Sequence, residues 1–197
     1  MAIAATKTTE LQAVNVVLST IGEPAVTALG TTDSTNAEAI LQEVYLQVLS
    51  SGWVFNTRSH EFTTNGSSEC VTDDSVIALD ANSPDSSNYT IRGNKIYIRS
   101  LNTTVFTQGV GFKISFQIVE LLAWLSLPES ARQYIAKRAG RVLVQRYLPD
   151  SNVLRAAVAD EQMALIALQR EELRVGNYSI MLNSNIGYPR SIVDRGL

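Results

Sequence analysis

The stretch "QVLSSGWVFNTRSHEF" (residues 47–62) changes its hydrophobic period at a Ser-Ser-Gly break. Before Gly52, apolar residues recur every three or four positions, which is typical of an amphipathic helix. After Gly52, Trp53 and Phe55 alternate with other residues, as side chains do along a strand. The stretch therefore predicts that a helical part of the chain ends at Gly52 and that a β part follows.

Two helices are predicted before this break. Residues 9–21 hold an apolar stripe of helical spacing, and Gly22 and Pro24 follow as stop signals. Residues 35–49 hold a broader apolar face after a polar connection. We expect these two helices to pair in antiparallel fashion.

The next part of the chain, from about residue 53 to residue 120, loses the helical period. It is rich in Ser, Thr, Asn and Gly, and it contains short runs in which apolar residues alternate with polar ones. In "RGNK" (92–95) a Gly-Asn pair separates two such runs, which is a strong signal for a two-residue hairpin. We predict an antiparallel meander.

The helical period returns at Pro128, which fits the first turn of a helix. The sequence "LPDSN" (148–152) then predicts a break, followed by a last helix from Val153 to Val175 that Gly176 ends. Residues 177–197 hold no long period, yet they are too apolar for a solvated tail. We expect them to lie on a surface of the same chain or of a neighbour.

These segments together predict an α+β fold. The N- and C-terminal helix pairs, in residues 1–52 and 127–176, form a four-helix bundle. A small antiparallel β sub-domain, residues 53–126, is inserted between the two pairs, and residues 177–197 form a C-terminal arm. With 197 residues, the chain is long enough to bury a core.

Composition excludes several functional classes. The net charge of −3 does not suit a general binder of nucleic acid or anionic membranes, because such proteins carry a basic excess. No signal peptide or membrane-spanning run of about 18 apolar residues is found, so no membrane location is expected. The single cysteine, Cys70, suits a chain made in a reducing cytoplasm.

Catalytic chemistry finds little support in the sequence. His60, the only histidine, and Cys70 are a candidate nucleophilic pair, but no partner that would orient them is evident. We favour an unrelated strand-end histidine and structural thiol. Asp73 and Asp74 are adjacent and indicate a solvated turn rather than a spaced pair of catalytic carboxylates. We predict no catalytic, metal or cofactor site, since phosphate-loop and nucleophile-elbow motifs are also missing.

The predicted third helix presents a basic face with Lys137, Arg138 and Arg141. One interpretation is contact with another subunit or with DNA. If the chain were one subunit of a ring-shaped oligomer, the positive charge of a modest basic stripe would be multiplied by the number of copies. The other is a solvated face that Glu161, Glu171 and Glu172 of the last helix balance. Arg132 and Arg146 project near the apolar side, where they can pair with carboxylates inside the bundle or across a subunit boundary.

Five stretches resemble one known family, in the same order and over nearly the whole chain. They are "ELQAVNVVLSTIGEPAV" (10–26), "GWVFN" (52–56), "IRGNKIYIRSLNTTVF" (91–106), "LPESARQYIAKRAGRVLVQRYL" (127–148) and "GNYSIML" (176–182). The family is the tail tubular protein A, or head-to-tail adaptor, of short-tailed bacteriophages. The chain departs from the family pattern at Ser179 and Ile180, which separate Tyr178 from Met181 where many relatives are shorter.

The resemblance implies a structural, non-enzymatic protein of the virion tail, made in the cytoplasm of the host bacterium. Adaptors of this family form a homo-oligomeric ring, usually of twelve copies, below the portal protein. The ring joins the portal to the nozzle protein (tail tubular protein B) and helps to hold the tail fibre protein. It forms part of the channel through which genomic DNA leaves without sequence-specific binding. No cofactor is implied.

The resemblance also implies that the C-terminal segment docks against the portal or a neighbouring subunit. The candidate contact residues are Tyr178, Met181, Leu182, Tyr188, Arg190 and Ile192. Two alternatives stay open, namely a tail-associated polysaccharide or cell-wall hydrolase and a glycan-binding module that presents its β loops. A hydrolase needs a carboxylate pair in a cleft, whereas the acids of this chain are scattered through predicted loops.

Overall fold

The computed structural model describes residues 7–79, 86–148 and 150–182, and it describes residues 176–182 by their backbone alone. The chain divides into two compact units. The helical unit comprises residues 1–51 and 122–172, and the β unit comprises residues 52–121 and 173–197. The architecture is α+β, as the sequence predicts.

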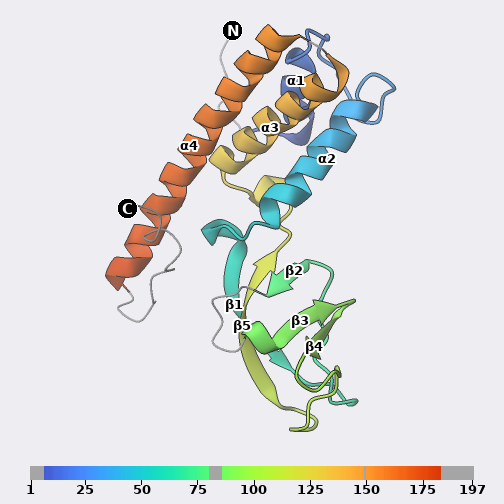
Figure 1. Ribbon diagram of the computed structural model, residues 1–197, viewed down its shortest axis with the longest axis vertical. Helices are drawn as coiled ribbons and strands as arrows, with labels where there is room; N and C mark the ends of the chain where they lie inside the picture. The colour runs from blue at the N-terminus through green and yellow to red at the C-terminus, as the bar shows by residue number, and fades with distance from the viewer. Residues whose placement is uncertain (1–6, 80–85, 149, 183–197) are drawn as a thin grey trace. The chain divides into compact units, whose positions relative to one another are not determined.

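The helical unit is built on three helices that contact one another, α1 (Glu10–Ser19), α2 (Thr35–Leu49) and α3 (Glu129–Tyr147). Within this unit, α3 lies between α2 and the N-terminal part of α4 (Ser151–Leu182) (Figure 1). The buried side chains of α1, α2 and α3 include Val14, Val17, Leu18, Ile40, Leu41, Val44, Val48, Ile135, Leu143 and Val144. They come from the stripes that recur every three or four residues, so hydrophobic periodicity predicts these helices correctly.

A close approach of α1 and α3 depends on Gly140. A Cβ atom at this position would lie 2.5 Å from the hydroxyl oxygen of Thr20, just after α1. That hydroxyl donates a 3.0 Å hydrogen bond to the carbonyl of Val16. A glycine in the middle of a helix destabilises it by about 1 kcal/mol relative to alanine. At this position the glycine allows the close contact with Thr20, which a larger residue would disturb.

Two arginines of α3 anchor other parts of the helical unit. Arg146 donates to both carboxylate oxygens of Glu43 in α2, at 2.8 and 2.9 Å, and this hydrogen bonding lowers the pKa of Glu43. Arg132 is fully buried and lies 3.8 Å from the carboxylate of Glu129. Of the two arrangements left open by the sequence, the structure shows both arginines beside carboxylates within the helical part of the chain.

Two predicted helix boundaries are wrong. α4 continues through Gly176 to Leu182, seven residues beyond its predicted end at Val175. A single glycine is a weak stop signal, because its helix penalty of about 1 kcal/mol is small against the gain from the flanking turns. Pro128 is the N-cap of α3 and not its first helical residue.

The β unit contains two small antiparallel sheets. Its strands are β1 (Thr57–Thr63), β2 (Val76–Leu79), β3 (Tyr89–Arg92), β4 (Lys95–Ile98) and β5 (Lys113–Glu120). The first sheet has the order β1-β5-β2, and the second is the hairpin β3-β4. The Gly-Asn hairpin is confirmed, since Arg92 pairs with Lys95 and Gly93 has a φ of +58°. The predicted meander is wrong, because β5 lies between two strands that precede it.

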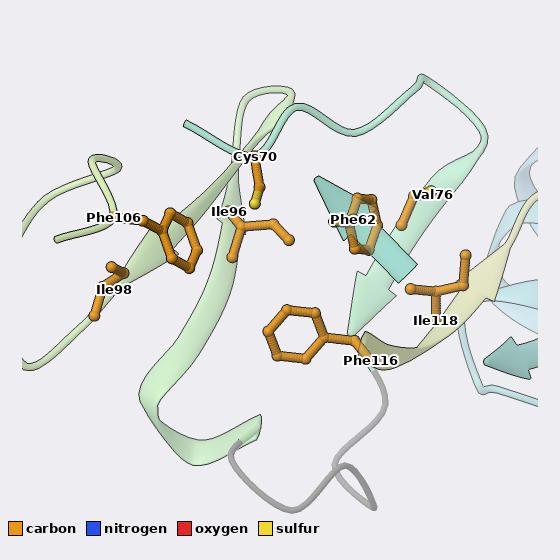
Figure 2. Packing of buried hydrophobic residues seen from close by; sticks show 8 residues of the cluster. All are labelled: Phe62, Cys70, Val76, Ile96, Ile98, Phe106, Phe116 and Ile118. Carbon is orange, nitrogen blue, oxygen red and sulfur yellow. The ribbon is translucent and has the colours of Figure 1, made fainter. Parts of the chain in front are cut away.

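One apolar core joins the two sheets (Figure 2). Phe62, Val76, Phe116 and Ile118 come from the three-stranded sheet, and Ile96 and Ile98 come from the hairpin. Cys70 and Phe106 complete the core from connecting segments. The side chains thus make one packed body of segments that are far apart in sequence.

The change of structure at Gly52 is confirmed, but the strand does not begin there. Gly52 has a φ of +71°, a conformation that favours glycine, and a Cβ atom would lie 3.3 Å from Val119. Val54–Asn56 then form a 3₁₀ turn, in which Trp53 donates its backbone N–H to the Asn56 amide oxygen at 2.8 Å. The expectation that Trp53 and Phe55 alternate on a strand is therefore wrong.

Candidate interaction surfaces

The basic residues predicted on the third helix all face acids of α4. The Lys137 ammonium lies 2.8 Å from the Asp160 carboxylate, and the Arg141 guanidinium binds Glu161. Arg138 lies 4.0 Å from Glu161. The expectation that the last helix balances this face is confirmed for Glu161, and the second carboxylate is that of Asp160. Contact of the same face with a subunit or with DNA stays a prediction.

A groove lies between α1 and α2. It has a volume of about 390 Å³ and is lined by Glu10, Val14, Leu29, Glu38, Leu41, Gln42, Tyr45 and Trp124. We call it the α1–α2 groove. Its lining combines apolar side chains with two carboxylates, neither of which pairs with a basic residue of the described part of the chain.

Local hydrogen bonds hold Glu38 of the groove in its charged form. The Ser34 hydroxyl and the Gly30 N–H, at 2.8 Å, both donate to its carboxylate and lower its pKa. The Tyr45 hydroxyl donates to the Leu122 carbonyl, and burial, together with the nearby charge of Glu10, raises the pKa of Tyr45. The groove thus offers apolar contact and negative charge, which suits binding rather than nucleophilic chemistry.

The C-terminal candidate residues fall into two sets. Tyr178, Met181 and Leu182 belong to the last turns of α4, where positions three and four apart occur on one helix face. Tyr188, Arg190 and Ile192 lie outside the described residues. The first three are therefore helical positions and not part of an irregular arm that begins after Gly176.

The candidate catalytic pair is not brought together by any contact among the described residues. Cys70 is buried in the core of the β unit, and burial raises the pKa of its thiol. His60 instead contacts Arg58 at 2.9 Å and the Phe62 ring at 4.5 Å between ring centres. A buried, protonated thiol is a poor nucleophile.

The adjacent acids Asp73 and Asp74 have separate structural partners. Asp73 accepts hydrogen bonds from the backbone N–H and the hydroxyl of Ser75, and Asp74 accepts one of 2.6 Å from the Asn94 amide. Both belong to a turn, as the sequence indicates. Across residues 7–79, 86–148 and 150–182, no group of three His, Cys, Asp or Glu side chains is arranged to hold a metal ion.

Sequence reasoning missed two surfaces, the α1–α2 groove and an exposed apolar row on α4. The row consists of Ala156, Ala159, Met163 and Ile166, and we call it the outer stripe. Its spacing of three, four and three residues indicates an apolar face of a helix. The same spacing is found for faces that are buried in a core, so it does not show that this face is exposed. Within the described residues, no helix combines the length and the apolar character needed to cross a membrane.

A protein-family model described as "Tail tubular protein" matches residues 11–178. The match takes in every strand of the β unit, all of α2 and α3, and most of α1 and α4. The chain belongs to the tail tubular protein family. It is thus a structural protein of a bacteriophage tail, located in the virion tail, and the resemblance found in the sequence is confirmed. No curated protein sequence matches the chain.

Proposed function

We propose that this chain is the subunit of a head-to-tail adaptor ring of twelve copies. The ring connects the portal protein to the nozzle protein (tail tubular protein B) and supports attachment of the tail fibre protein. The observation that supports this most strongly is the family match, which runs through both the helical unit and the β unit. The chain works by surface complementarity and has no catalytic role or cofactor.

A closed ring places a physical demand on each subunit. Every copy must present two different lateral faces, because head-to-tail contacts repeat around the ring. The helical unit has such unlike surfaces in the acidic, apolar α1–α2 groove and the exposed side of α4. These surfaces support assembly into a ring over a role as a single binding module.

The ring forms part of the channel through which genomic DNA leaves the capsid. A chain with a net charge of −3 does not attract phosphates strongly, which suits DNA that passes without sequence-specific binding. Lys137, Arg138 and Arg141 add a local contact to a subunit or to DNA. Their pairing with α4 leaves little free positive charge on this face, so the contact is weak.

The proposed architecture has three parts. Residues 1–52 and 127–176 form a four-helix bundle, and residues 53–126 form the inserted β sub-domain. The segment 177–197 docks against the portal or a neighbouring subunit. Its proposed contact residues are Tyr178, Met181, Leu182, Tyr188, Arg190 and Ile192. The apolar composition of this segment supports docking over solvation.

The subunit is made in the cytoplasm of the host bacterium and needs no membrane. Its single cysteine supports this location, because Cys70 is a buried free thiol in a structural core. The reducing cytoplasm keeps such a thiol in the form that packs there.

The test is the mass of the purified chain, alone and after mixing with the portal protein of the same phage, together with negative-stain images. A ring that appears on the portal supports the proposal, and a ring without the portal shows that assembly needs no template. A monomer that ignores the portal contradicts the proposal. Glycan-binding and hydrolysis assays on that monomer then test the two alternatives.

A further inference from the structure

Helix α4 has two apolar faces, and the described residues cover only one of them. On the covered side, Ala157 and Leu168 are buried, with 5% and 0% of their surfaces exposed. On the outer stripe, Met163 and Ile166 are 71% and 46% exposed. The stripe has the three-and-four spacing that lets one helix pack against other helices.

The exposed side of α4 also holds positive charge that has no ion-pair partner among the described residues. Arg155, Arg170 and Arg174 are exposed, and none forms an ion pair with a carboxylate of the described residues. This distinguishes them from the paired basic residues of α3. The outer stripe is therefore an apolar row flanked by arginines that no carboxylate of the described residues pairs with.

The α1–α2 groove has the complementary composition. Its apolar lining includes Leu29, which is 41% exposed, and Trp124. Glu10 and Glu38 provide negative charge without a basic partner among the described residues. Apolar surface and opposite charge in both partners favour association and suppress wrong pairings.

The two surfaces lie on different sides of the helical unit. The groove is formed by α1 and α2, the stripe is on α4, and α3 lies between α2 and α4 (Figure 1). A subunit therefore presents its stripe to one neighbour and its groove to another. Contacts of this head-to-tail kind generate a ring when the rotation between copies closes.

We propose that the outer stripe of one subunit docks in the α1–α2 groove of the next copy of this chain. This inference rests on the proposed ring and names its lateral contact. Met163 and Ile166 contact the apolar lining of the groove. Arg155 and Arg170 face its two carboxylates.

The first test changes the stripe in the full chain. Met163→Glu combined with Ile166→Glu introduces two carboxylates opposite an acidic groove, and we expect loss of the ring both alone and on the portal. Both side chains are exposed, so the monomer should keep the thermal melt of the wild type. Arg170→Glu is a milder second variant and should also weaken assembly. The matched control is Val110→Glu, which changes an exposed apolar residue of the β unit and should leave assembly intact.

The second test identifies the pairing. Chains with Met163→Cys and chains with Leu29→Cys are purified separately, mixed, and exposed to a mild oxidant. We expect a disulfide-linked dimer that contains one chain of each kind. Cys70 is buried, so the wild-type chain serves as the uncross-linked control.

The outcomes separate this inference from the proposed function. A ring that survives the double stripe substitution, or cross-linking of the Met163→Cys chain only with itself, overturns the stripe-to-groove contact and leaves the adaptor ring standing. A wild-type chain that forms no oligomer, alone or with the portal, overturns both.

Discussion

The guanidinium of Arg132 donates a 3.1 Å hydrogen bond to the backbone carbonyl of Thr8, a residue 124 positions earlier in the chain. Two further hydrogen bonds from Arg132, at 3.1 and 2.6 Å, reach the carbonyl of Leu127. Thr8 in turn donates its backbone N–H to Glu129 at 3.0 Å. One buried cation thus fastens the segment before α1 to the start of α3.

Replacing this cation should destabilise the helical unit. Arg132→Ala removes both guanidinium hydrogen bonds to the Leu127 carbonyl, leaves the Thr8 carbonyl with only the Trp124 indole N–H as its side-chain donor, and opens a cavity. We therefore expect a loss of about 3 kcal/mol in the free energy of unfolding. Urea denaturation followed by circular dichroism measures it. The control is Gln162→Ala, at an exposed position of α4, which should change stability by less than about 0.5 kcal/mol. Equal effects of the two substitutions would contradict this role of Arg132.

A double-mutant cycle at Gly140 and Thr20 should show strong coupling. Gly140→Ala gains helix propensity of about 1 kcal/mol, but its methyl group must displace the Thr20 hydroxyl, and we expect little or no net gain. In a Thr20→Ala background the methyl group has room, so the same change should stabilise by about 1 kcal/mol. Thermal or urea unfolding of the four proteins gives the coupling. Additive effects would show that the two residues do not limit each other.

Acid should weaken the contact between Thr8 and α3. Burial opposes ionisation of Glu129, but hydrogen bonds from Gln133 and Thr8 and the charge of Arg132 outweigh it, so its pKa is lowered. Such a carboxylate stabilises the fold above its unfolded pKa of about 4.3, and the contribution is lost as pH falls through the lower folded pKa.

The measurement is the urea midpoint of wild type and of Glu129→Gln at several pH values between 7 and 3. We expect the variant to be less stable at pH 7 and the difference to shrink as the pH falls below about 4. Thr8→Ala removes one donor to the same carboxylate and should act in the same direction. A difference that stays constant with pH would rule out this linkage.

Cys70 should behave as a structural residue and not as a reactive one. Because the thiol is buried and its pKa is raised, we expect a thiol reagent to label the native chain only as fast as the β unit opens. Labelling in urea provides the reference for the accessible thiol. Cys70→Ala should keep the oligomeric state of the wild type. Fast labelling of the native chain would revive the candidate Cys-His pair.

The features that sequence predicts well are local. The hairpin at Gly93 and Asn94 depends on two residues and their immediate flanks, and the helices depend on a repeat within a few turns. The position of β5 between β1 and β2 depends on pairings such as Thr57 with Val119, 62 positions apart. No local pattern encodes that order, which is why a meander was the wrong interpretation.

The candidate interaction surfaces also depend partly on local patterns and partly on contacts between distant residues. The spacing of Met163 and Ile166 is visible in the sequence, but whether a helix face is buried depends on what packs against it. The α1–α2 groove requires Leu29 and Trp124 to meet across nearly a hundred residues of chain. The alternation of Trp53 and Phe55 misled for a related reason, because a short apolar run fits a strand and a 3₁₀ turn equally well.

The helical unit is assembled from two segments, residues 1–51 and 122–172, with the segment 52–121 between them. On the ribosome, α1 and α2 must wait for α3, and at 5–20 residues per second the intervening stretch of about 70 residues takes roughly 4–14 s to synthesise. During that interval the strands β1 to β5 emerge as one uninterrupted stretch, so their sheets can form first. The α1–α2 groove needs Trp124 and the outer stripe needs α4, so both surfaces exist only after the β strands have been made, which delays premature association of nascent subunits.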